Sequence, residues 1–145
     1  MKQLLVLAAA VALILPLAAV SATSKRSGVL HVTKNCREYT GAAGSFCTIT
    51  TSNLNAIKPG TKVVYASAAG VPTAGLLNSD LVLDGPGNNT AYGHVVLNLS
   101  TRSGVVTFSG GTGEFSHFHA GPIAVACPVL PDCTWDGPYS FSPPN

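Results

Sequence analysis

Charged residues are scarce in this sequence. Lysine and arginine together number eight, and aspartate and glutamate six, in a chain of 145 residues. No basic run is present, so the chain lacks the electrostatic footprint of a nucleic-acid-binding protein, and we expect no nucleic acid as a partner. Low charge combined with a 46% hydrophobic composition is not typical of a disordered chain and suits a compact extracellular β-protein.

A long uncharged apolar stretch stands at the N-terminus. Lys2 supplies a short positive region, residues 4–17 are uncharged and apolar, and Val20-Ser21-Ala22 offers a small-residue cleavage site. This order is typical of a secretory signal peptide, whereas Pro16 and the missing basic stop do not favour a membrane anchor. The sequence therefore predicts a signal peptide over residues 1–22 and a secreted protein, extracellular or periplasmic, with no membrane association after cleavage.

The remaining residues, 23–145, are enough for a single domain with one core. They lack an amphipathic helical period and any internal repeat. Short runs rich in β-branched and aromatic residues recur instead, separated by Gly, Pro and Asn clusters, at 28–33, 45–52, 61–67, 79–84, 91–100, 104–110, 114–127 and 133–141. This pattern predicts an all-β fold, an eight-stranded antiparallel β-barrel whose closure removes the exposed edges of an open sheet.

Period-two alternation assigns the two faces of these strands. The apolar sets are predicted to point inward, because the opposite choice would bury unpaired carboxylates. The inward set comprises Leu81, Leu83, Val95, Leu97, Leu99, Val106 and Phe108, and the outward set includes Asp80, Asp84, His94 and Asn98. The interior is thus expected to be largely aliphatic and to hold little acid–base chemistry.

All four cysteines follow the predicted cleavage point. An even number in an exported chain indicates disulfides, with three pairings open. Proximity in the sequence favours Cys36–Cys47 and Cys127–Cys133. The alternative, a zinc site, does not suit gaps of ten and five intervening residues, which differ from the usual zinc-binding spacing.

The stretch GGTGEFSHFHAG, residues 110–121, is rich in glycine. A phosphate-binding loop would follow a strand, begin a helix and usually end in Gly-Lys-Ser or Gly-Lys-Thr. Here two strands flank the stretch, and Glu114 would repel an anion. We therefore interpret the glycines as positive-φ positions of a hairpin or bulge.

The same region resembles the allene oxide cyclase barrel-like family, which is related to plant dirigent proteins. The similarity consists of Gly111, Thr112, Gly113 and Phe115, matching Gly-Thr-Gly-x-Phe, and of the later WDGPYSF. It implies an eight-stranded barrel with a lumen over residues 28–142, often assembled as an oligomer. The Ala-Arg-Gly that dirigent proteins usually carry after the phenylalanine is replaced here by His119-Ala120-Gly121, so that arginine has no counterpart. No catalytic residue of the cyclase is carried over.

Few residues suggest a binding site. His117 and His119 stand two apart on a predicted strand, a spacing that would let both reach one metal, but no third ligand is fixed by the sequence, so we predict no metal and no cofactor. The candidates for contacting a small ligand are His117, His119, Phe118, Trp135 and Tyr139. For the two last aromatics, packing in the core or on a disulfide is the simpler role.

No Gly-x-Ser-x-Gly elbow or other catalytic signature is present, so whether the protein is an enzyme is left open. The main hypothesis is a secreted barrel that binds a small apolar ligand in its lumen or serves as an extracellular scaffold. One alternative is an isomerase or cyclase acting on a hydrophobic substrate. The other is a structural protein that self-associates as a homo-oligomer through outward residues such as Val64 and Val82.

Overall fold

A computed structural model describes residues 26–69 and 75–142; the predicted signal peptide, residues 1–22, lies outside these ranges. The described chain forms eight strands and one short 3₁₀ helix. Their bounds are β1 Ser27–Asn35, β2 Phe46–Ser52, β3 Lys62–Tyr65, β4 Leu76–Asp84, β5 Thr90–Asn98, β6 Ser103–Gly111, η1 Gly113–Phe115, β7 Phe118–Val129 and β8 Asp132–Phe141. Within the described ranges, no helix is long and apolar enough to cross a membrane.

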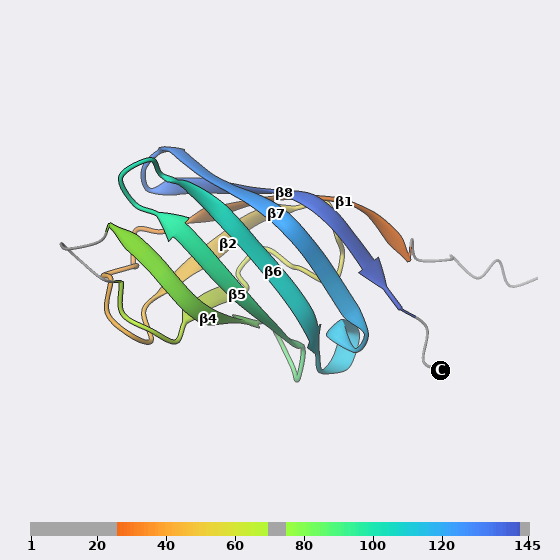
Figure 1. Ribbon diagram of the computed structural model, residues 1–145. Coiled ribbons are helices and arrows are strands. Elements are labelled where there is room, and N and C mark those ends of the chain that lie inside the picture. The colour runs from red at the N-terminus through yellow and green to blue at the C-terminus, as the bar shows by residue number, and fades with distance from the viewer. Residues whose placement is uncertain (1–25, 70–74, 143–145) are drawn as a thin grey trace, which may run out of the picture.

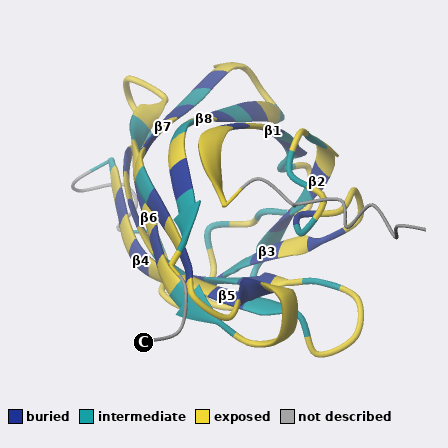
Figure 2. Ribbon diagram, turned by 90° about the vertical axis from the view of Figure 1, so that its right-hand side faces the viewer, coloured by how far each residue is buried: buried dark blue, intermediate teal, exposed yellow. Residues whose placement is uncertain are grey.

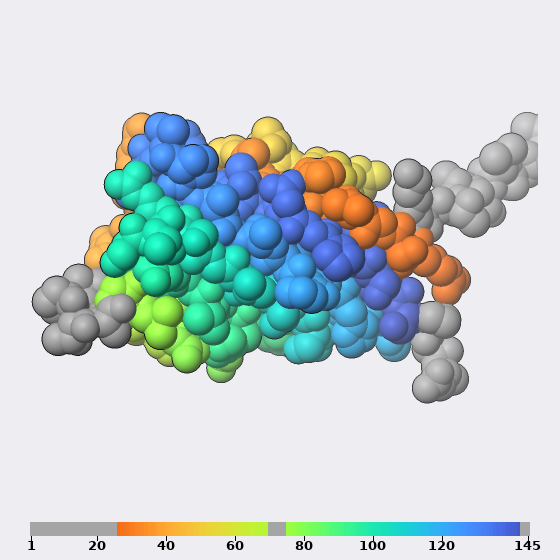
Figure 3. Space-filling view, turned by 45° about the horizontal axis from the view of Figure 1, so that its top comes forward, coloured from red at the N-terminus to blue at the C-terminus, as the bar shows by residue number. Residues whose placement is uncertain are grey.

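The strands form a closed antiparallel barrel in chain order, so the predicted fold class is confirmed. Closure depends on β1 and β8, which pair from Ser27↔Ser140 to Asn35↔Asp132. Figure 1 shows the strands wound obliquely around one axis, and Figure 3 shows β6, β7, β8 and β1 side by side across one face. Every strand therefore has a hydrogen-bonded neighbour on both sides, which leaves no open sheet edge.

The predicted faces are also confirmed. Leu81, Leu83, Val95, Val106 and Phe108 are buried in the core. The residues between them are exposed, among them Asp80, Asp84, His94 and Asn98. Figure 2 shows this alternation as buried and exposed bands along single strands. Because adjacent residues of a strand point to opposite sides of the sheet, one stripe fills the interior and the other meets solvent.

Several predicted strand boundaries differ from the observed ones; β1, for example, continues to Asn35 and β4 begins at Leu76, and one difference changes the local structure. Residues 114–127 were expected to be a single strand, but Gly113–Phe115 forms η1 and β7 begins only at Phe118. Gly110 and Gly113 do have positive φ, at 103° and 59°, as the turn interpretation requires. A Cβ at Gly113 would lie 2.1 Å from Oδ1 of Asn89, the atom that accepts a hydrogen bond from the Glu114 N–H. Only glycine fits this turn.

The turn places an aromatic plug at one end of the barrel. Phe115 from η1 is fully buried, with its ring 5.4 Å from that of Phe118, and Phe118 in turn lies 5.1 Å from Phe141 and 5.7 Å from Phe108 between ring centroids. These rings continue inward to Trp135, 5.5 Å from Phe108. The interior is therefore aliphatic in part only, since this end is filled by aromatic side chains.

Two disulfides stand at the opposite end. The bonds are Cys36–Cys47 and Cys127–Cys133, the pairing favoured by proximity. The first joins the segment after β1 to β2, and the second joins β7 to β8 across their hairpin. The two bonds are neighbours, because Sγ of Cys36 lies 4.0 Å from Sγ of Cys133. They reinforce the end of the barrel that has no aromatic plug.

Candidate functional site

A cavity of about 170 Å³ lies at the disulfide end of the barrel. Its walls come from every strand except β6 and from the β1–β2, β5–β6 and β7–β8 connections, and they are mainly apolar. The lining residues are Lys34, Cys36, Tyr39, Cys47, Tyr65, Leu77, Leu97, Leu99, Arg102, Cys127, Leu130 and Cys133. An apolar cavity of roughly 150 Å³ in a protein core is large enough to hold benzene. This cavity therefore suits a ligand of similar size.

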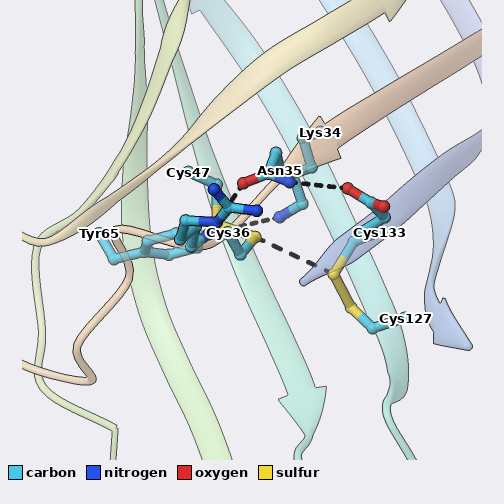
Figure 4. Close-up of a disulfide and its surroundings, with 9 residues drawn as sticks. Lys34, Asn35, Cys36, Cys47, Tyr65, Cys127 and Cys133 are labelled. Carbon is cyan, nitrogen blue, oxygen red and sulfur yellow. Dashed lines mark hydrogen bonds between the residues drawn. A yellow bond between two sulfur atoms is a disulfide. The ribbon is translucent and has the colours of Figure 1, made fainter. Parts of the chain in front are cut away.

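Lys34 is the central polar residue of the cavity. It continues the inward stripe of β1 two residues beyond Val32, and it is only 2% exposed. Its Nζ donates a hydrogen bond to the hydroxyl oxygen of Tyr65 at 2.5 Å, shown in Figure 4. The same nitrogen lies 4.8 Å from the ring centroid of Trp135 and 5.3 Å from that of Tyr65. The amine thus sits among aromatic rings and one hydroxyl.

Burial governs the protonation of this group. Among the described residues, no carboxylate forms an ion pair with Lys34. Without a counter-ion, desolvation lowers the pKa of Lys34 from its usual 10.5 to about 7. Burial, and secondarily the nearby Tyr39, raises the pKa of Tyr65, so its hydroxyl keeps its proton. Near neutral pH the cavity therefore contains an amine that exchanges between charged and neutral forms.

Tyr39 adds an unsatisfied hydroxyl to the same site. Its ring packs edge-on against Tyr65, with 5.1 Å between the centroids, and it lines the cavity. Its hydroxyl oxygen is buried and has no hydrogen-bond partner among the described residues, and neither has Nε1 of Trp135. Buried polar atoms are usually hydrogen-bonded. A free hydroxyl beside an apolar cavity is therefore suited to meeting a polar atom of a ligand.

The residues predicted from the sequence are spread over other parts of the barrel. Phe118 belongs to the aromatic plug, and Trp135 is fully buried, with its ring against Lys34. His117 and His119 are exposed to solvent. Because residues 114–117 are not a strand, the two histidines do not share a strand face with Phe115. Only Trp135 among the five candidates contacts the amine in the cavity.

A second hollow, of about 320 Å³, brings His119 and Tyr139 together. Its other lining residues are Phe108, Ala120, Gly121, Pro138 and Ser140. It is the less suitable site, because His119 and Pro138 are exposed and it contains no buried charged or unpaired polar group. Within the described residues, no group of three or more His, Cys, Asp or Glu is placed to hold a metal ion.

Sequence reasoning missed Lys34, Tyr39 and Tyr65. The strand expected at 28–33 ended before Lys34, because a lysine is normally read as the exposed end of a strand. A signal was available, since Leu30, Val32 and Lys34 follow a strict two-residue spacing. Tyr65 similarly follows Val63 on the inward side of β3. Tyr39 lies in a connecting segment, where alternation gives no guide.

No family model matches the chain, and the comparisons with curated proteins and with solved structures found no match. The site therefore has to be interpreted from its own geometry.

Proposed function

We propose that this protein binds a small apolar molecule in the cavity at the disulfide end of the barrel. The observation that carries the proposal is the cavity itself, about 170 Å³ of space with mainly apolar walls and a few polar groups that converge on it. Ligand sites are typically apolar hollows with a small number of polar groups that fix orientation. The aromatic plug fills the other end of the barrel, which leaves the disulfide end for entry.

Fluorescence of Trp135 supplies a direct test, since it is the only tryptophan and its ring lies against Lys34 at the cavity. Titration with toluene is expected to change its emission in a saturable way. Leu97→Phe is expected to weaken this binding about tenfold, because the larger side chain takes up cavity space that the toluene ring would need. Val96→Phe, on the exposed outer side of the same strand, is the matched control and leaves binding unchanged. Absence of saturable binding would overturn the proposal.

We also propose that the protein works outside the cytosol. Two disulfides in a small chain suit an oxidising compartment and agree with the predicted signal peptide. The resemblance to the allene oxide cyclase barrel-like family and self-association as an oligomer stay predictions. The alternative of an isomerase or cyclase has less support, because His117, His119 and Glu114 are all exposed.

A further inference from the structure

The amine of Lys34 is buried in the interior of the barrel. It reaches into an apolar cavity, is 2% exposed, and has no carboxylate partner among residues 26–69 and 75–142. The titratable groups that share the cavity are Tyr65 on β3, Tyr39 in the segment between β1 and β2, and Arg102 in the turn between β5 and β6. None of these supplies a negative charge at neutral pH.

These surroundings favour the neutral amine. Burial lowers the pKa of Lys34 to about 7, so a substantial fraction of the molecules carries a free electron pair on Nζ near neutral pH. Lysines in apolar pockets are the amines that react with carbonyl compounds in proteins, because only the neutral form is nucleophilic. An amine with the ordinary lysine pKa near 10.4 is almost entirely protonated at the same pH.

The cavity also offers hydroxyl groups to a carbonyl oxygen. The Tyr65 hydroxyl lies 2.5 Å from Nζ of Lys34, and the Tyr39 hydroxyl, carried on a ring that packs against that of Tyr65, is buried without a partner among the described residues. A carbonyl group that approached Nζ would therefore have a hydrogen-bond donor close to its oxygen. The apolar walls formed by Leu77, Leu97 and Leu99 would contact the rest of the molecule.

We propose that Lys34 forms an imine with a small apolar aldehyde or ketone held in this cavity, an inference that rests on the proposed ligand-binding function. The Nζ electron pair attacks the carbonyl carbon, the carbon–oxygen π bond opens, and a proton passes from nitrogen to oxygen to give a carbinolamine. The carbon–oxygen bond then breaks and a carbon–nitrogen double bond forms. Two hydrogens of the amine and the carbonyl oxygen leave as water, with no oxidant or reductant.

Benzaldehyde is the probe, and sodium cyanoborohydride traps the imine as a stable secondary amine. The disulfide-bonded protein is treated with both reagents at pH 7.5 and digested, and the masses of its peptides are measured by mass spectrometry. Lys34 is expected to gain the mass of benzaldehyde less one oxygen atom, at least tenfold faster than the exposed Lys58 and Lys62. The N-terminal amine has an ordinary pKa near 7.7 and also reacts, but its peptide is distinct.

Two variants and one competitor make the result specific. Lys34→Met removes the adduct, while Lys62→Met leaves it unchanged. Benzyl alcohol, which has the shape of the probe but no carbonyl group, is expected to protect Lys34 in the unaltered protein, a measurement that does not depend on how a variant folds. Tyr39→Phe is expected to slow trapping severalfold with little effect on toluene binding, because it removes a hydroxyl but keeps the ring.

The outcomes separate the two proposals. Saturable toluene binding with Lys34 modified no faster than Lys62 would overturn the imine and leave the binding function standing. Binding of benzoate to the cavity without trapping of benzaldehyde would likewise overturn it, by showing that Lys34 acts as a cation for a carboxylate. Loss of both toluene binding and trapping would overturn both proposals.

Discussion

The Nζ atom of Lys34 lies 2.5 Å from the hydroxyl oxygen of Tyr65, and both side chains are buried inside the barrel. The lysine comes from β1 and the tyrosine from β3, so β2 separates the strands that carry them. A buried polar pair costs free energy unless its hydrogen bonds are made and its charge is compensated. Here the hydrogen bond is made and the charge has no carboxylate partner in the part of the chain that the structure describes, so the pair's effect on stability depends on pH.

Stability is expected to rise with pH because of Lys34. Below about pH 7 both folded and unfolded chains hold the proton, and the folded state bears the full cost of a buried charge. Between about 7 and the usual 10.5, the unfolded chain binds a proton that the folded chain lacks, so raising the pH favours folding. The gain is about 2 kcal/mol between pH 7 and 9.

Chemical denaturation of the wild type and Lys34→Met at pH 6, 7, 8 and 9 measures this effect. All other titratable groups are the same in the two proteins. The difference between their free energies of unfolding at each pH therefore isolates the effect of Lys34. The range stops at pH 9 because the raised pKa values of Tyr39 and Tyr65 lower stability above about pH 10, where the unfolded tyrosines lose their protons first. Parallel curves for the two proteins would contradict a buried, titrating amine.

Replacement of Tyr65 by phenylalanine is expected to leave Lys34 without its acceptor. Losing the partner of a buried polar group costs about 1–3 kcal/mol, and more when that group is charged. Tyr65→Phe should therefore reduce the free energy of unfolding more at pH 6 than at pH 9. Tyr92→Phe, at an exposed position on β5, is the control and should change it by less than about 0.5 kcal/mol. An equal loss at both pH values would show that Tyr65 contributes packing only.

The barrel could be predicted from the sequence because closure depends on features that repeat along the chain. Apolar residues such as Leu81, Leu83 and Val95 recur at alternate positions, and glycine-rich turns separate the strands. The disulfide pairing also agrees with the one that sequence proximity favours. Each of these patterns involves residues close together in the sequence. The barrel and the disulfide pairing could therefore be predicted without knowing which strands pair or having a known relative.

The site could not be predicted, because it arises from how the two barrel ends are filled. η1 inserts Phe115 at one end, whereas the sequence suggested a continuous strand there. The other end keeps a cavity, and Lys34 faces it only because the inward stripe of β1 continues for one more step. Alternation gives the side on which a residue lies. It does not show which interior positions are packed and which border empty space.

The requirement for glycine at position 113, the first residue of η1, can be tested by substitution. Gly113→Ala introduces a Cβ at positive φ, and that Cβ would lie 2.1 Å from Oδ1 of Asn89. Gly41→Ala is the matched control, because Gly41 also has positive φ, at 83°, but no atom of a described residue lies within 4 Å of the added Cβ.

The control substitution should cost about 1–2 kcal/mol from backbone conformation alone. Gly113→Ala should cost at least about 1 kcal/mol more, because it also displaces the Asn89 amide that binds the Glu114 N–H. Thermal or chemical denaturation measures both values. Equal losses would show that Asn89 moves aside freely.

The short distance between the two disulfides predicts that a different disulfide, Cys36–Cys133, can form where β1 pairs with β8. Figure 4 shows the sulfur atoms of Cys36 and Cys133 facing each other. These Sγ atoms are 4.0 Å apart, and the Cys36 N–H donates a hydrogen bond to the Pro131 carbonyl oxygen at 2.8 Å. The double variant Cys47→Ala, Cys127→Ala leaves only these two cysteines. It is expected to oxidise to a Cys36–Cys133 disulfide, which non-reducing peptide mapping identifies.

This bond would link the end of β1 to β8, the pair of strands that closes the barrel, across a sequence separation of 97 residues. The loop-entropy estimate gives roughly 4–5 kcal/mol for such a bond, against about 2–3 kcal/mol for each native one. Oxidation should therefore raise the stability of the variant above that of its own reduced form.

The complementary variant, Cys36→Ala, Cys133→Ala, leaves Cys47 on β2 and Cys127 on β7. These strands are separated by β1 and β8, so Cys47 and Cys127 do not lie on neighbouring strands, and in the structure their Sγ atoms are connected only through the contact between Cys36 and Cys133. The complementary variant is therefore expected to form an intramolecular disulfide more slowly than the first variant under the same conditions. Equal rates in the two variants would show that the disulfide end of the barrel moves enough for thiols on non-adjacent strands to meet as readily as those of Cys36 and Cys133.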